Sequence, residues 1–82
     1  MLNKELTRAA RALLGLSQAE VAERASMAVK TIADFERGAT SPQPRTLRDI
    51  QRVFEQEGIE FLFEGAHAVG LRIRKQNADP AS

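Results

Sequence analysis

Two short helical segments follow one another closely in the middle of this chain. Ser17 and Glu20 have the spacing of a capping box, in which the serine hydroxyl accepts from the glutamate amide and the carboxylate reaches back. A helix is therefore predicted to begin at Gln18. After a break of a few residues, apolar positions resume at helical spacing and predict a second helix over residues 28–36, which ends at Gly38. Two short helices joined in this way form a helix-turn-helix.

Longer helices are predicted on either side of this pair. Apolar residues at helical spacing over residues 4–14 precede Gly15, a residue that readily ends a helix. The following loop contains prolines, and Pro44 suits the first position of a helix over residues 44–57. Residues 1–58 are therefore predicted to form a mainly α domain of four helices.

The hydrophobic period changes from 3.6 to 2 after this domain. Apolar and polar residues alternate in two runs within residues 59–75, which predicts a β-hairpin with one apolar face. The acidic residues of the first run and the basic residues of the second are expected to pair across the strands. His67, at the hairpin tip, is interpreted as a polar turn residue without a function. Residues 76–82 lack apolar anchors and are predicted to be disordered.

Length and composition exclude several classes of protein. A chain of 82 residues suffices for one compact domain and not for two. With no Cys and a single His, it predicts no disulfide, no metal site, no cofactor and no catalytic activity. No apolar run has the length of a signal peptide or a membrane span, so a cytoplasmic protein is expected. No segment is left for a ligand-binding domain, and no small-molecule ligand is expected.

The charges are unevenly distributed along the chain. Residues 28–48 carry four positive charges against two negative, whereas residues 49–64 carry five negative against one positive. The middle segment is thus the basic part of the chain, as a polyanion partner would require. By itself this pattern is more often that of an ordinary solvated surface than of a binding site.

Three separated blocks of sequence resemble the phage Cro and repressor type, or XRE-like, helix-turn-helix regulators. They are LLGLSQAEVAE at residues 13–23, KTIADFERG at 30–38 and the pattern PxxxTLxxI at 42–50. The resemblance covers residues 4–57 and implies a bacterial transcriptional regulator that binds double-stranded DNA, most often as a repressor. The hairpin stands where such domains usually have a fifth helix, as in a small subset of the family.

The resemblance implies that the helix over residues 28–36 enters the major groove of DNA. Its base contacts would come from Val29, Lys30, Ala33 and Asp34. Lys30 can donate to guanine, Asp34 can accept from cytosine, and the two apolar side chains can pack against a thymine methyl group. The alternative is that Lys30 and Asp34, four residues apart, form only a surface ion pair.

The resemblance also implies a set of contacts with the DNA backbone. The residues expected to make them are Ser17, Gln18, Thr31, Arg37 and Arg45. Gln18 lies in the first turn of its helix, where free amides and the helix dipole favour a phosphate. Its alternative role is that of a solvated residue at a helix start.

Arg11 and Glu36 occupy positions that form a partly buried ion pair in the resembling repressors, which implies a mostly structural role, with a phosphate contact by Arg11 as an additional alternative. Two positions depart from the family pattern. Ser26 stands where a Gly is frequent in the turn, and Ala28 stands where a Ser or Thr often caps the recognition helix. The turn must therefore accommodate a Cβ atom, and the recognition helix is expected to begin without a side-chain cap.

The apolar face of the hairpin is predicted to join two copies of the chain. Its residues are Ile59, Phe61, Phe63, Val69, Leu71 and Ile73. A hairpin alone is marginally stable in water, and a two-fold homodimer can place two recognition helices about 34 Å apart on a palindromic operator. Two alternatives stay open. The whole face could pack against the helix over residues 44–57 of its own chain, or the protein could be an antitoxin or adaptor that binds another protein.

Overall fold

A computed structural model describes residues 1–74, which form four helices followed by a two-stranded antiparallel sheet. The elements are α1 (Lys4–Leu14), α2 (Gln18–Ala25), α3 (Val29–Arg37), α4 (Pro44–Gln56), β1 (Ile59–Glu64) and β2 (His67–Ile73). The predicted mainly α fold with a C-terminal hairpin is confirmed. The prediction of a disordered segment at 76–82 lies outside the described residues.

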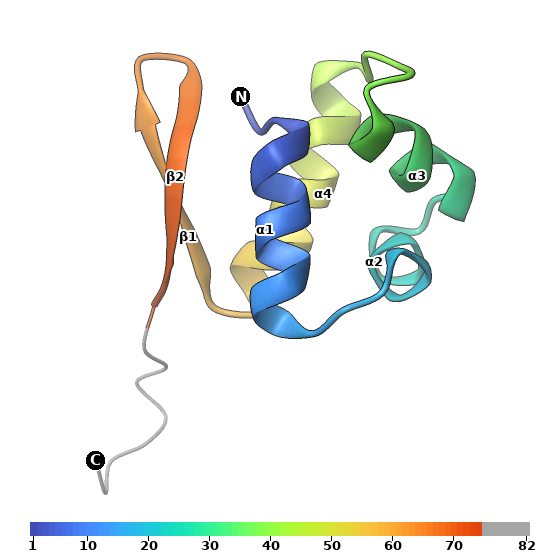
Figure 1. The fold of residues 1–82 in the computed structure, drawn as a ribbon, viewed down its shortest axis with the longest axis horizontal. Helices are drawn as coiled ribbons and strands as arrows, with labels where there is room; N and C mark the ends of the chain where they lie inside the picture. The colour runs from blue at the N-terminus through green and yellow to red at the C-terminus, as the bar shows by residue number, and fades with distance from the viewer. Residues whose placement is uncertain (75–82) are drawn as a thin grey trace, which may run out of the picture.

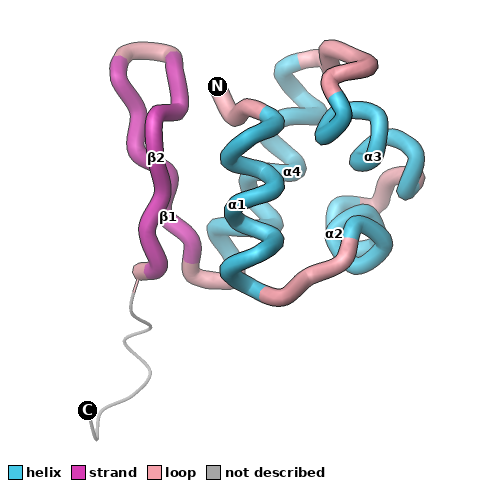
Figure 2. The backbone as a smooth tube through the Cα atoms, in the orientation of Figure 1, coloured by secondary structure: helices cyan, strands magenta, loops and turns pink. Residues whose placement is uncertain are grey.

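The helices and the hairpin lie side by side, with α1 and α4 between the hairpin and the pair α2 and α3 (Figure 1). The tube drawing in Figure 2 shows the same order, and the short loops keep α2 and α3 next to each other. The helix-turn-helix and the hairpin therefore occupy opposite ends of the molecule.

Local signals in the sequence account for the helix boundaries. The capping box at the start of α2 is formed, with Ser17 Oγ accepting from the Glu20 amide at 3.0 Å and Glu20 Oε1 accepting from the Ser17 amide at 2.8 Å. Ser26 ends α2 in the left-handed conformation, with φ of 58°, so the turn does accommodate a Cβ atom where Gly is frequent. No side chain caps α3, as expected from the Ala28 side chain at its N-cap position.

The core joins all four helices to the first strand. Val21 of α2, Ile32 of α3 and Ile50 of α4 are fully buried. Phe54 of α4 meets Phe61 of β1 edge to face, with ring centroids 6.1 Å apart and an angle of 69° between the rings. The hairpin is thus an extension of the helical core.

A β-bulge divides the predicted apolar face of the hairpin. Leu62 pairs with Gly70 and Phe63 with Ala68, which leaves Val69 without a partner. Ala68 takes the inward position and is 6% exposed, whereas Val69 is 55% exposed. Alternation of apolar and polar residues alone does not predict that Ala68 is buried and Val69 exposed, because a bulge shifts the faces of all residues beyond it relative to the partner strand.

The six residues predicted to join two copies are therefore not equivalent. Ile59 and Phe61 are buried by the helices of their own chain, and Leu71 is partly buried against the same core. Phe63, Val69 and Ile73 are exposed. The expectation that all six face a second copy is corrected for Ile59 and Phe61, because neighbouring α4 already covers them.

The outer face of the hairpin carries the predicted cross-strand ion pair. Glu60 lies opposite Arg72 in the strand register, and Arg72 Nε donates to Glu60 Oε1 at 2.8 Å. The bond lowers the pKa of Glu60 and raises that of Arg72. The pair stabilises the strand register and is well exposed, so its contribution is small.

Candidate nucleic-acid interface

The four residues predicted to contact bases lie along one side of α3. Their positions, i, i+1, i+4 and i+5, place them on a common face of a helix. Lys30 is the most exposed, with 82% of its side chain accessible, and Val29 is also exposed. Ala33 and Asp34 are half-buried. The opposite side of the helix packs into the core, so α3 presents this row outward, on the end of the molecule away from the hairpin (Figure 1).

Asp34 holds two cations on the surface of α3. Lys30 Nζ lies 2.9 Å from Asp34 Oδ2, and Arg37 donates to Oδ1. Hydrogen bonds from Lys30 and Arg37 lower the pKa of Asp34, so the carboxylate is charged. The surface ion pair considered as an alternative role of Lys30 is therefore present in the free protein. Exposed pairs of this kind are weak and can exchange one partner for another.

Glu36, at the end of α3, connects three helices through its buried carboxylate. The residue is 4% exposed. Arg11 of α1 donates two hydrogen bonds, Nε to Oε2 at 2.7 Å and Nη2 to Oε1 at 2.8 Å, and Gln18 of α2 donates to Oε1 at 3.1 Å. The predicted ion pair between Arg11 and Glu36 is thus formed in a bidentate geometry.

The charge state of Glu36 follows from these contacts. Burial alone would raise the pKa of the carboxyl group, but the hydrogen bonds from Arg11 and Gln18 outweigh it, and the pKa is lowered. Arg11 also donates to the carbonyl oxygen of Leu16, at 3.0 Å, between α1 and α2. Together these bonds hold α3 in a fixed orientation relative to α1 and α2.

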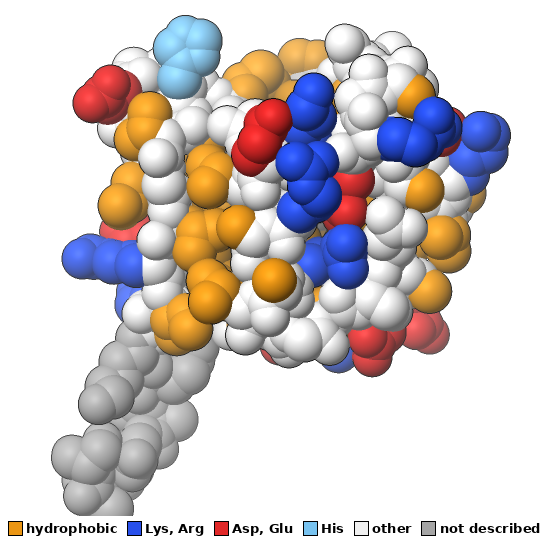
Figure 3. Space-filling model, in the orientation of Figure 1, with side chains coloured by type: hydrophobic (Ala, Val, Ile, Leu, Met, Phe, Trp, Pro, Cys, Tyr) orange, Lys and Arg blue, Asp and Glu red, His pale blue; other side chains and the backbone are white. Residues whose placement is uncertain are grey.

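Arg8 is an additional basic residue that sequence reasoning missed. It donates to the carbonyl oxygen of Glu36 and so binds the C-terminal end of α3. With Arg11, Arg37 and Gln18, it lines a hollow of about 430 Å³ beside α3. In Figure 3, Lys and Arg side chains gather over α1 and over the α3 end of the molecule. The signal for Arg8 was its i, i+3 spacing from Arg11, which places both on one face of a helix.

The residues predicted to contact the DNA backbone surround the same side of the molecule. Arg37 and Arg45 are exposed, and Thr31 is half-buried beside a second hollow of about 380 Å³ between the starts of α3 and α4. The first turns of these two helices have no side-chain cap. Gln18 uses its side-chain amide on Glu36, and Ser17 uses its hydroxyl in the capping box. The backbone amides in the first turns of α3 and α4 are accordingly the more available donors.

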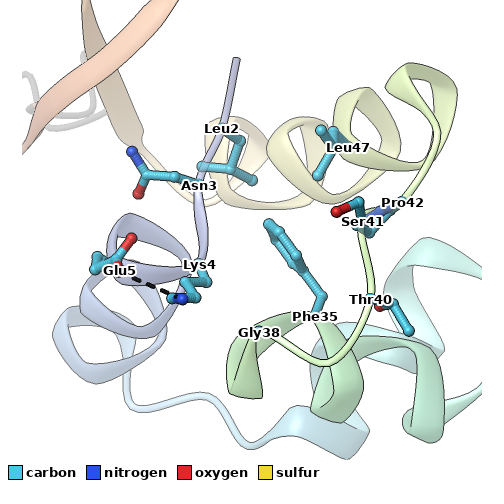
Figure 4. A pocket seen from close by; sticks show the side chains of 10 residues that line it. All are labelled: Leu2, Asn3, Lys4, Glu5, Phe35, Gly38, Thr40, Ser41, Pro42 and Leu47. Carbon is cyan, nitrogen blue, oxygen red and sulfur yellow. Dashed lines mark ion pairs between the residues drawn. The ribbon is translucent and has the colours of Figure 1, made fainter.

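A third hollow, of about 380 Å³, lies outside this set of residues (Figure 4). Leu2, Phe35 and Leu47 form its apolar wall, and Lys4 and Glu5 form an ion pair of 4.0 Å at its rim. No residue predicted to contact DNA lines it.

Within residues 1–74, no group of three acidic or histidine side chains is arranged to hold a metal ion. None of the helices in the described part of the chain is both long and apolar enough to cross a membrane.

The short pair α2 and α3, with a solvent-facing row on α3 and cations beside it, defines a helix-turn-helix DNA-binding domain. The family model described as helix-turn-helix matches residues 8–61, which include α2, α3, α4 and the start of β1. The chain belongs to this family, the XRE-like helix-turn-helix regulators. A comparison with curated proteins finds no match.

Proposed function

We propose that the protein is a sequence-specific transcriptional repressor that reads its operator by placing α3 in the major groove. The main support for this proposal is the row of solvent-facing side chains on α3. The helix that carries this row is held in place by the buried contacts of Glu36 with Arg11 and Gln18. A recognition helix must keep its orientation while its side chains reach base edges, and these contacts meet that requirement. When such a domain occupies promoter DNA, it represses transcription by blocking the access of RNA polymerase.

The roles on α3 follow from the chemistry of each side chain. Lys30 leaves Asp34 and donates to guanine O6 and N7, while Arg37 continues to neutralise Asp34. Asp34 can then accept from cytosine N4 without an unbalanced charge next to the phosphates. Val29 and Ala33 offer apolar contact to a thymine methyl group.

Contacts with phosphates position the domain without reading sequence. We assign this role to the exposed cations Arg37 and Arg45, to Thr31, and to Ser17 and Gln18 at the start of α2. Arg8 joins them, because it borders the hollow between α1 and the end of α3.

The operator of this proposal is a palindrome bound by a homodimer. Four of the exposed large apolar residues lie on the hairpin, namely Leu62, Phe63, Val69 and Ile73. The hairpin lies at the end of the molecule opposite α3, so two chains joined through it leave both recognition helices free (Figure 1). One domain reads only a few base pairs, and a two-fold dimer doubles the site that is read.

The same exposed residues support a second candidate, an antitoxin or adaptor whose hairpin binds a different protein. The two candidates differ in what the hairpin binds. A repressor of the proposed kind is joined to a second copy through the hairpin, whereas in the second candidate the hairpin binds a different protein. Sedimentation of the purified chain at micromolar concentration tests the first candidate, and a monomer would favour the second.

Selection of duplexes from a random-sequence library by the purified protein tests the proposed function. We expect one palindromic sequence to be enriched, and variants of it then test the roles of individual residues. Lys30→Ala is expected to lose discrimination at one base position of each half-site, at a cost of about 1–3 kcal/mol. Gln18→Ala is expected to weaken binding to every duplex alike, because phosphate contacts carry no sequence information.

Titrations against each single-base variant of the selected site provide the measurement. If Lys30→Ala weakened all variants equally, its assignment to base contact would be wrong. Failure to enrich any sequence would contradict the proposed function itself.

A further inference from the structure

Ala68 of the hairpin makes two hydrogen bonds with the N-terminal segment of the chain. The Ala68 amide donates to the carbonyl oxygen of Met1 at 3.3 Å, and the Ala68 carbonyl oxygen accepts from Asn3 Nδ2 at 3.0 Å. Ala68 is the residue that the β-bulge places inward. The amino terminus lies beside the upper part of the hairpin in Figure 1.

Asn3 also caps α1 with the other atom of the same side-chain amide. Its Oδ1 accepts from the Leu6 amide at 2.8 Å. The two bonds require a hydrogen-bond acceptor toward α1 and a donor toward Ala68. Among side chains of this length, only the amide of Asn has both groups. Because the amide is planar, it fixes the first turn of α1 relative to the bulge in the hairpin.

The hairpin has a different attachment at its base. There it follows α4 through Gly58, whose φ of 100° lies in the left-handed region, and Ile59 is buried in the core. Toward the tip, Phe63 and Val69 are exposed. Phe61 and Leu71 attach the middle of the hairpin to the core. The contact of Asn3 with Ala68 is a further attachment nearer the tip, next to the exposed residues, and it restrains the orientation of the tip.

We infer that Asn3 is a positioning residue for operator recognition. By fixing the hairpin relative to α1, and through α1 relative to α3, it sets the separation and relative orientation of the two recognition helices in the dimer. The inference rests on the proposed function, in which two chains are joined through their hairpins. It assigns to Asn3 a role in selecting the spacing of half-sites and no contact with DNA.

Asn3→Asp separates the two roles of the residue. Asp caps a helix as well as Asn does, so α1 keeps its cap, but a carboxylate cannot donate to the Ala68 carbonyl and repels it. Asn3→Ser also retains a capping group and is too short to reach both partners. Glu20→Ala is the matched control, since it removes one bond of the capping box at the start of α2, lies outside the residues assigned to DNA contact and leaves the hairpin untouched.

The measurement is a titration of each protein against the selected palindrome, against palindromes with base pairs added or removed between the half-sites, and against a single half-site. For the wild type, a spacing that prevents simultaneous binding of both half-sites is expected to lower affinity by about 100-fold or more. For Asn3→Asp and Asn3→Ser, the same change is expected to lower affinity by about tenfold or less, because the hairpins can turn. Affinity for the single half-site is expected to stay the same.

Two results would overturn the inference in different ways. If Asn3→Asp kept the spacing preference of the wild type and of Glu20→Ala, Asn3 would have no positioning role, while the proposed function would stand. If the wild type bound half-sites as tightly as palindromes, the dimeric operator complex would be disproved, and the inference with it.

Discussion

Replacement of Glu36 by Ala is expected to lower the free energy of unfolding by about 3 kcal/mol, near the lower end of the range for a broken buried ion pair. The substitution leaves the guanidinium of Arg11 and the amide of Gln18 without their acceptor. The lower end applies because 23% of the Arg11 side chain is exposed and water can solvate it. In a domain of this size the melting temperature should fall by about 12 °C or more.

Thermal melts followed by circular dichroism measure this effect. Lys30→Ala is the control, because it breaks an ion pair on the surface of the same helix and should leave the melting temperature nearly unchanged. DNA binding by Glu36→Ala should recover when the protein is assayed at a temperature where it is folded. An unchanged melting temperature together with lost binding would show that Glu36 contacts DNA.

The lowered pKa of Glu36 adds a dependence on pH to the same prediction. In the unfolded chain a Glu titrates at about pH 4.3, so the stabilisation from Glu36 is complete above that pH and is lost as the pH falls toward the folded-state pKa. Glu36→Gln removes the contribution of this carboxyl group to acid unfolding. The free energy of unfolding of the variant should therefore decline less than that of the wild type between about pH 5 and pH 3.

The second large effect is expected at the tip of the hairpin. Val69→Glu places a charge on an exposed position of the proposed interface, and we expect a folded monomer whose affinity for the palindrome falls to that for a half-site, a loss of about 100-fold or more. Phe61→Glu, in contrast, is expected to unfold the chain, because the ring lies against Phe54 in the core. Gln56→Glu adds the same charge on an exposed part of α4 and should remain a dimer.

Sedimentation and melting curves separate these outcomes. If Val69→Glu stayed dimeric and bound the palindrome normally, the hairpin tip would not form the interface. If Phe61→Glu stayed folded while only the dimer dissociated, the division of the hairpin residues between core and surface would be wrong.

Local signals in the sequence sufficed to predict most of the fold. The capping box at Ser17 and the glycines at 15 and 38 determine where helices begin and end through contacts within one turn. Helix boundaries therefore agree with prediction to within one residue, as for α3, which begins at Val29 where 28 was expected. The ion pair of Arg11 with Glu36 was inferred from resemblance, since its partners are far apart in sequence.

Features that depend on pairing between distant segments could not be predicted in this way. The bulge at Val69 leaves Ala68 inward, where its amide bonds to Met1 of the N-terminal segment, and alternation within β2 carries no sign of it. The bond from Asn3 to Ala68 spans 65 positions, and the bond from Arg8 to the Glu36 carbonyl spans 28. Such contacts are products of tertiary packing, which periodicity and local propensity do not describe.

The docking of α3 on DNA can be tested directly by cleavage from a tethered iron chelate. The chain contains no Cys, so a single introduced Cys is a unique attachment point. Ala28→Cys places the chelate at the exposed start of α3, where no capping bond is lost, and Ala66→Cys places it on the exposed turn of the hairpin, outside the residues proposed to join two chains. We predict strand cleavage within each selected half-site from Ala28→Cys and none there from Ala66→Cys. Cleavage within the half-sites from Ala66→Cys, with none from Ala28→Cys, would contradict the assignment of α3 as the element that reads DNA.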